Sequence, residues 1–272
     1  PEEKAQMQAE AANKLRDRDL GLQAKQKAVA SEVVTLLGVS EAAPPDHPYL
    51  VSKQARAGEL RIVPPASTAL PENTNLIIGK DWKESAALRE SHPDKLVFTE
   101  GDLLVPAYDV NGAIWTVQTI QDSGRKMFAK DSVKQANFHI VGASGNGLDA
   151  LATAPAIVIG EGYATADSLS NTLGFPTVSA FDSGNLELVA KALHDKFPDK
   201  PIIIAGDDDK HLESTQGYNP GRTKASDAAK AVGGKAIFPI FAPGEQAAEP
   251  KKFCDFNDLA TKSALGEEGI KR

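Results

Sequence analysis

The sequence predicts an α+β unit followed by an α/β unit with a parallel central sheet, and three observations support this fold class. Short apolar runs alternate with helical patterns over residues 151–245, which is typical of βαβ units. The preceding region, 43–150, instead holds several short strand candidates and an Asn-Gly hairpin turn. A stretch of good helix formers precedes both regions. At 272 residues, the chain is long enough for two such units.

Residues 1–42 are expected to form a helical extension. Residues 1–38 are rich in Ala, Glu, Lys, Gln and Leu, which all favour helix formation. Gly38 is a natural helix stop, and Gly21 is a point at which the stretch could divide into two helices. Apolar residues become frequent only in the second half, so we expect that half to pack against the rest of the protein. The prolines of residues 42–48 then predict a linker.

Residues 43–150 are predicted to form an N-terminal α+β subdomain. An Asn111-Gly112 turn joins two apolar runs, which indicates a β-hairpin. A further turn and a final strand at Phe138–Val141 would close an antiparallel meander. The strand candidates, in order, are 60–63, 75–78, 103–108, 113–120, 125–128 and 138–141.

Residues 151–245 are predicted to form the α/β domain, and residues 246–272 a C-terminal helical tail. The apolar runs are β-branched, uncharged and bounded by turn residues, as expected of buried parallel strands. Strands are expected at 156–160, 176–179, 201–205 and 235–238, and helices at 163–173, 185–197 and 222–232.

Acidic residues follow two of these strands at the point where each strand ends. Glu161 stands between two glycines after the first strand, and Asp207, Asp208 and Asp209 follow the third. Parallel strands end at one edge of a sheet, where open α/β sheets bind their ligands, and neighbouring strands lie about 4.8 Å apart. Carboxylates that converge there repel one another unless a cation lies between them. Their oxygens suit Mg²⁺ or Mn²⁺, so we expect metal-dependent chemistry on a phosphate.

Two structural interpretations of these acids stay open. Glu161 can simply favour the start of the following helix, and the three aspartates can form a solvated turn that caps the next segment. Neither cluster belongs to a known nucleotide-binding loop. Thr165 replaces the third glycine of a dinucleotide fingerprint, and the chain has no Gly-x-x-x-x-Gly-Lys-Ser/Thr sequence.

Basic residues between 125 and 134 form a candidate nucleic-acid surface, although the net charge of the whole chain is −7. Trp115 or Phe128 is available to stack a base beside them. Arg222 and Lys224 lie near the start of a predicted helix, and a helix N-terminus favours the binding of phosphate. Both groups can also be solvated charges without a ligand. The candidate DNA-binding residues are Arg125, Lys126, Lys130 and Lys134.

The composition excludes several other classes of protein. With one cysteine, Cys254, the chain has no internal disulfide framework and no zinc site made of cysteine pairs. We find no signal peptide and no apolar run long enough to span a bilayer, so we expect a cytoplasmic protein without membrane contact. Because the chain begins at Pro1, we expect it to be either a processed product or, in preference, a fragment of a longer polypeptide.

The acidic motifs resemble those of the Toprim domain, which bacterial-type primases, type IA and type II topoisomerases and some nucleases share. Glu161 in Gly-Glu-Gly, followed by Asp207-x-Asp209, carries this resemblance. The wider chain is similar to the primase module of plasmid conjugation proteins and related phage primases. The similar segments, in order, are 46–50, 104–112, 124–128, 138–142, 159–165, 180–185, 219–221 with Lys224, and 255–258.

The resemblance implies a DNA primase core that makes RNA primers from ribonucleoside triphosphates on single-stranded DNA, in plasmid conjugation or replication. It implies that Glu161, Asp207 and Asp209 are catalytic and hold divalent metals, and we include the adjacent Asp208 among the metal ligands. Lys126, together with Arg222 and Lys224, would bind nucleotide phosphates. The zinc-binding domain and the helicase segment of related proteins are absent from this sequence, so we expect partner domains in a longer parent polypeptide.

Two other functions remain open. A nuclease or a topoisomerase-related module would use the same acids to cleave DNA, although none of the four tyrosines lies in an evident nucleophile context. Alternatively, the chain could be a non-catalytic module that binds transferred single-stranded DNA. Nucleotide-sugar transferases also use Asp-x-Asp, but they do not predict the Gly-Glu-Gly partner.

Overall fold

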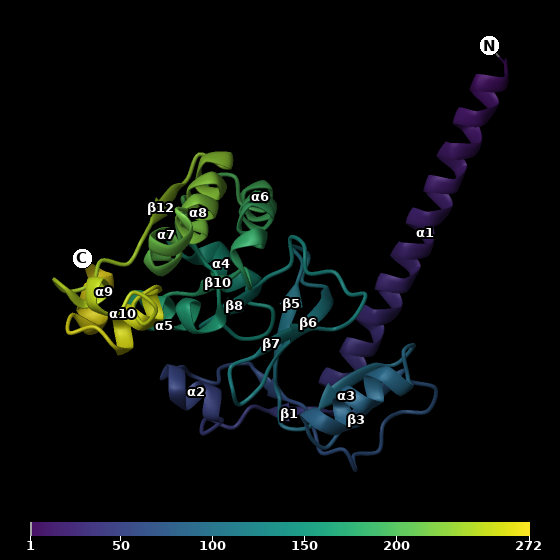
Figure 1. Ribbon diagram of the computed structural model, residues 1–272, viewed down its shortest axis with the longest axis horizontal. Coiled ribbons are helices and arrows are strands. Elements are labelled where there is room, and N and C mark those ends of the chain that lie inside the picture. The colour runs from purple at the N-terminus through teal and green to yellow at the C-terminus, as the bar shows by residue number, and fades with distance from the viewer. Residues whose placement is uncertain (1) are drawn as a thin grey trace.

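The computed structural model describes residues 2–272, and it shows a long helix that projects from a body built around two main sheets (Figure 1). This helix, α1 (Glu2–Val39), runs without interruption through Gly21, so the chain does not divide there. One glycine lowers the stability of an exposed helix by about 1 kcal/mol, which is not enough to interrupt a helix of 38 residues. Only the C-terminal part of α1 packs on the body, as predicted, and Val33 and Leu36 are fully buried there.

The N-terminal sheet is antiparallel throughout, with the strand order β1-β2-β5-β6-β7. The predicted hairpin is confirmed as β5 and β6, and Gly112 adopts the positive φ of 81° that its turn requires. Asp109 holds the turn, because its carboxylate accepts from the backbone N–H groups of Asn111 and Ala113. The strands are β1 (Glu41–Ala42), β2 (Arg61–Ile62), β5 (Leu103–Tyr108), β6 (Ile114–Ile120) and β7 (Lys126–Phe128).

A small βαβ unit packs beside this sheet. Strands β3 (Leu76–Gly79) and β4 (Leu96–Thr99) pair in parallel, and helix α3 (Trp82–Ser91) connects them. Strand β3 was predicted from the sequence, whereas α3 and β4 were not. Asp81 caps α3, because its side chain accepts from the N–H of Glu84. A separate short helix, α2 (Pro48–Lys53), follows the linker.

The second sheet has the order β12-β11-β9-β10-β8, and its four strands β9 to β12 are parallel, as predicted. The last strand of the predicted meander, β8, forms as expected but belongs to a different sheet from the one predicted. It pairs antiparallel with β10 at the edge of this second sheet, and an isolated Tyr108–Phe138 bridge joins the residue before it to the first sheet. The strands are β8 (His139–Val141), β9 (Ile157–Gly160), β10 (Thr177–Ser179), β11 (Ile202–Ala205) and β12 (Lys235–Ile237).

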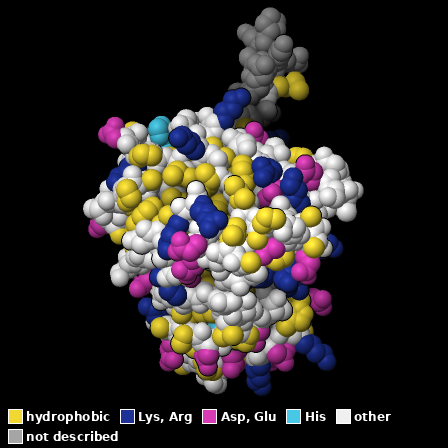
Figure 2. Space-filling view, turned by 90° about the vertical axis from the view of Figure 1, so that its left-hand side faces the viewer, with side chains coloured by type: hydrophobic (Ala, Val, Ile, Leu, Met, Phe, Trp, Pro, Cys, Tyr) yellow, Lys and Arg dark blue, Asp and Glu magenta, His cyan; other side chains and the backbone are white. Residues whose placement is uncertain are grey.

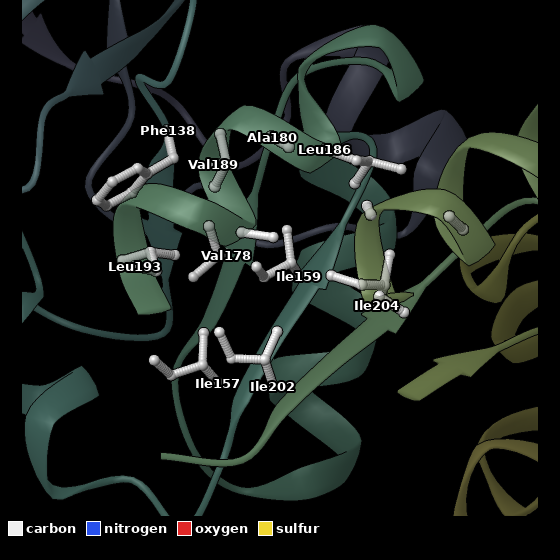
Figure 3. Packing of buried hydrophobic residues seen from close by; sticks show 14 of the residues in the cluster. Phe138, Ile157, Ile159, Val178, Ala180, Leu186, Val189, Leu193, Ile202 and Ile204 are labelled. Carbon is white, nitrogen blue, oxygen red and sulfur yellow. The ribbon is translucent and has the colours of Figure 1, made fainter. Parts of the chain in front are cut away.

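Helices cover both faces of the parallel sheet, which confirms the α/β class of this region. On one face, side chains of α6 such as Leu186 and Leu193 pack on Ile157, Ile159 and Ile204 of the strands (Figure 3). On the other face, α5 and α10 pack against the alternate strand residues. The helices are α4 (Leu148–Thr153), α5 (Tyr163–Leu173), α6 (Leu186–Lys196), α7 (Lys210–Gln216), α8 (Pro220–Ala231), α9 (Glu245–Ala248), α10 (Phe256–Thr261) and α11 (Gly266–Lys271).

Figure 2 looks onto the side of the molecule that carries α9, α10 and α11. Basic and acidic side chains are interspersed over this face, and hydrophobic side chains gather in its upper half. The face therefore offers no continuous positive surface to a nucleic-acid backbone. Among the described residues, no helix combines the length and the apolar character needed to cross a membrane.

Candidate active site

The two predicted acidic motifs meet at the carboxyl edge of the second sheet. Strands β9 and β11 are neighbours, with Gly160 opposite Ala205, so Glu161 and Asp207 follow two adjacent strand ends. Both side chains are partly buried, and one carboxylate oxygen of each, Glu161 Oε1 and Asp207 Oδ1, is buried without a hydrogen-bond partner. Buried polar atoms of this kind are costly unless a ligand satisfies them, and oxygen donors of this type suit a divalent cation.

The pKa values at this edge are raised, as expected of carboxyls that have lost water and face like charges. Burial is the largest cause that raises the pKa of Glu161 to about 7, and Asp209, Asp182 and Asp255 add to it, against a backbone hydrogen bond from Asp207. Burial also raises the pKa of Asp207 well above its usual value, followed by the charge of Glu161. Metal-free, the cluster therefore holds protons that a cation would replace.

Asp255, the N-cap of α10, joins the cluster, and no role was predicted for it from the sequence. Its carboxylate caps α10 by accepting from the N–H of Asp258, and Asp258 returns the bond to complete a capping box. Burial raises the pKa of Asp255, with Asp258 as the next cause. The Asp-x-x-Asp pattern at a helix start was the available signal, but it indicated a cap and not a position beside Glu161.

We expect Mg²⁺ or Mn²⁺ to raise the melting temperature of the protein more at about pH 8 than at about pH 6. The pKa of Glu161 is raised from 4.5 to about 7, so the stability that this carboxyl contributes in protonated form is lost as pH rises through about 7. A bound cation restores it only when the carboxyl is ionised. Thermal unfolding with and without metal measures the effect, and Glu161→Gln should remove it. An equal shift at both pH values would contradict this expectation.

The middle aspartate of the acidic run points away from this cluster. Asp208 is 2% exposed, and its carboxylate accepts bonds from Arg222 Nε at 2.7 Å and from Asn219 Nδ2 at 2.8 Å. Gln246 donates to the same group at 3.2 Å. We therefore leave Asp208 out of the metal-binding set that we propose. Arg222 is engaged in this ion pair as well, and Lys224 lies exposed further along α8.

The Asn219-Pro220-Gly221 segment fixes the orientation of the acidic turn. The side-chain Oδ1 of Asn219 accepts from the backbone N–H of Asp209 at 3.1 Å, and the N–H of Gly221 donates to Asp209 Oδ2 at 3.0 Å. A Cβ at position 221 would lie only 2.5 Å from the carbonyl oxygen of Asp207, so glycine is required for this close approach. The segment thereby holds Asp207 and Asp209 at the sheet edge while Asp208 turns inward.

Two lysines from the N-terminal region face the acidic cluster. The Lys126 ammonium of β7 lies 3.3 Å from the place that a Cβ on Gly162 would occupy, directly beside Glu161. Loss of water lowers the pKa of Lys126, with Lys53 of α2 as the next cause, and the nearby carboxylates oppose this shift. Asn257 of α10 holds α2 against the α/β region by donating to the carbonyl oxygen of Lys53 at 2.8 Å. Lys126 was predicted from the sequence as a phosphate-binding residue, and Lys53 was not.

The other predicted DNA-binding residues contact different parts of the protein and do not form one basic surface. Lys130 donates to the carbonyl oxygen of Pro93 at 3.1 Å, and Lys134 pairs with Asp182. Arg125 lies over the ring of Trp82, with 4.2 Å between its Cζ atom and the ring centroid. Arg89 lies 5.4 Å from the same ring, which is 41% exposed.

The aromatic side chains that the sequence analysis offered for stacking are engaged elsewhere. Trp115 donates to Asp109 at 3.0 Å, and Phe128 packs edge-on against Phe181 with 5.2 Å between ring centroids. Trp82, which was not predicted from the sequence, is an exposed aromatic side chain that lies beside the predicted basic residue Arg125.

Comparison with known sequences shows which family of domains contains this part of the chain. Residues 156–264 match the family model of the Toprim domain, a range that contains all four clustered acids and extends through α10. The whole chain aligns with two Escherichia coli proteins named DNA primase TraC, at 40% and 41% identity. These alignments cover 27% and 20% of the two relatives, so the chain spans about a quarter or less of their length.

Solved structures with a similar fold include two primases. The DnaG primase catalytic domain bound to single-stranded DNA is 14% identical, with a TM-score of 0.54 over 92% of this chain and 81% of the other. The Aquifex aeolicus primase, comprising its zinc-binding and RNA polymerase domains, is 18% identical, with a TM-score of 0.55 over 91% and 60% of the two chains. At this identity the likeness concerns the fold, and it extends over both main sheets.

Proposed function

We propose that this chain, whose residues 156–264 form a Toprim domain, is the catalytic core of a DNA primase that extends RNA primers on single-stranded DNA. The observation that carries the proposal is the convergence of Glu161, Asp207, Asp209 and Asp255 at one sheet edge, opposite Lys53 and Lys126. The 40% identity of the whole chain to part of DNA primase TraC supports the same assignment. The setting in plasmid conjugation, the cytoplasmic location and the partner domains stay predictions.

The proposed reaction joins a primer 3′-hydroxyl to the α-phosphate of a ribonucleoside triphosphate, and pyrophosphate leaves. Glu161, Asp207, Asp209 and Asp255 would hold Mg²⁺ or Mn²⁺, which neutralises triphosphate charge and favours ionisation of the attacking hydroxyl. The unpartnered carboxylate oxygens of Glu161 and Asp207 fit this role, because hard oxygen donors are the ligands that both ions prefer.

The two lysines would position the triphosphate. Lys53 and Lys126 bring positive charge to an edge that is otherwise acidic, so a phosphate can lie between the cation and these ammonium groups. They come from the N-terminal region, whereas the acids come from the Toprim domain. A buried cluster that includes Tyr49, Val141 and Tyr163 joins the two regions. The proposed nucleotide site therefore needs both regions in this arrangement.

Trp82→Ala is expected to weaken binding of single-stranded DNA about tenfold. Trp82 is an exposed ring backed by Arg125 and Arg89, and a base stacked on an aromatic side chain contributes roughly 1–3 kcal/mol. Fluorescence anisotropy of a labelled oligonucleotide at fixed salt measures the affinity. Leu188→Ala is the matched control, because Leu188 is also 41% exposed but lies on α6. Equal dissociation constants for the two variants would exclude Trp82 from the template surface.

The proposal is tested by labelled ribonucleotide incorporation on single-stranded DNA with and without Mg²⁺ or Mn²⁺. A parallel reaction with labelled DNA and metal, but no nucleotides, detects cleavage. Incorporation that depends on metal supports a primase core. DNA shortened without nucleotides would assign the acids to a nuclease, and DNA binding with neither reaction would indicate a binding module.

A further inference from the structure

A second cluster of metal-ligating side chains adjoins the acidic cluster and differs from it in chemistry. Asp209, His211 and Cys254 each offer one ligand atom, and these three atoms all lie within 4.8 Å of one another. Asp209 precedes α7, His211 lies in its first turn, and Cys254 lies in the loop before α10. All three are partly buried and therefore accessible to an ion from the solvent.

The geometry suits a tetrahedral ion with nitrogen and sulfur ligands. Cys254 Sγ lies 3.7 Å from His211 Nδ1. Two such ligands on a tetrahedral Zn²⁺ are separated by about 3.5 Å, given Zn–S and Zn–N bonds of about 2.3 and 2.0 Å. Thiolate and imidazole are ligands that Zn²⁺ prefers and that Mg²⁺ does not, so this cluster would select a different ion from the neighbouring carboxylates.

We propose that Asp209, His211 and Cys254 bind Zn²⁺ or a similar soft divalent cation, and that this binding inhibits primer extension. On ligation, the Cys254 thiol releases its proton to the solvent, and a water molecule completes the coordination. Asp209 belongs to both clusters, so its carboxylate is withdrawn from the catalytic cation when the soft ion binds. The inhibitory part of this inference rests on the proposed function, whereas the binding part does not.

Binding is tested with Co²⁺, which replaces Zn²⁺ in tetrahedral sites and is visible by absorption. Because Cys254 is the single cysteine, a thiolate-to-cobalt charge-transfer band can arise only from this site. We expect the band to saturate at one thiolate-bound Co²⁺ per chain, no charge-transfer band in Cys254→Ser, and affinity at this site lower by on the order of tenfold or more in His211→Gln. His92→Gln, an exposed histidine on another element, should bind like wild type. Absence of the band at saturating Co²⁺, or equal affinity in His211→Gln, would overturn the proposal.

Inhibition is tested by titrating Zn²⁺ into the Mg²⁺-supported extension reaction. We expect the half-inhibitory Zn²⁺ concentration to rise about tenfold or more in Cys254→Ser and His211→Gln, while activity without Zn²⁺ is retained. Equal inhibition of wild type and both variants would mean that Zn²⁺ acts at the catalytic carboxylates, which refutes the inhibitory role. The Co²⁺ measurement needs no template or nucleotide, so it tests the site even if the chain makes no RNA.

Discussion

Asp207→Asn is expected to reduce metal-dependent primer extension by on the order of a thousandfold while the fold stays intact. The substitution removes one negative charge from the centre of the acidic cluster and keeps the shape of the side chain. Asp207 carries an unpartnered buried oxygen, and its pKa is raised by burial first and by Glu161 next. Without metal, the variant should therefore melt at the same or a higher temperature than wild type, because a buried repulsion is relieved.

Extension assays and thermal unfolding, measured on the same preparations, check both parts of this prediction. Asp195→Asn is the control, since it makes the same chemical change at an exposed position on α6. The control should match wild type in both measurements. Retained extension by Asp207→Asn would remove Asp207 from the metal site, and a large loss of melting temperature would mean that its carboxylate is structural.

Arg222→Ala is expected to lower the free energy of unfolding by about 2 kcal/mol without changing the affinity for nucleotides. It would leave Asp208 buried without its bidentate partner, and losing one member of a buried ion pair costs roughly 3–5 kcal/mol. We expect a smaller loss of unfolding free energy, because the Arg222 side chain is 43% exposed and Asp208 keeps its hydrogen bonds from Asn219 and Gln246. Urea denaturation measures the change.

Lys224→Ala is the matched control for this prediction, since Lys224 is exposed two residues further along the same helix. It should change the free energy of unfolding by less than about 0.5 kcal/mol. The sequence analysis assigned both residues to phosphate binding, and that hypothesis predicts the opposite pattern. A raised KM for nucleotides with unchanged stability in Arg222→Ala would restore the phosphate-binding interpretation and contradict the structural one.

The parallel sheet could be predicted from the sequence because its strands are short apolar runs separated by helical patterns. This periodicity is local, and it located β9 to β12 within one residue at each end. The existence of strand β8 was predicted, but the sheet assigned to it was wrong, because that sheet is set by tertiary pairing with β10, far along the chain. The β3-α3-β4 unit was incomplete for a similar reason. Helix α3 is weakly amphipathic, and β4 has only four residues.

The candidate site was predictable where it depends on strand ends and unpredictable where it depends on side-chain direction. Glu161 and Asp207 could be placed together because parallel neighbouring strands end at one edge. Three consecutive aspartates do not reveal that the middle one turns inward to Arg222. Asp255 and Lys53 reach the site through contacts between distant parts of the chain, which neither spacing nor composition encodes.

The most direct test of the central proposal is extension of a short RNA dinucleotide on single-stranded DNA by the wild-type chain. Labelled ribonucleotides are supplied with Mg²⁺ or Mn²⁺, and the template base opposite the primer end is varied. The proposed primase core predicts a product whose added nucleotide follows the template base and which disappears when the metal is chelated. Absence of any extension in either metal, by protein that binds the template, would contradict it.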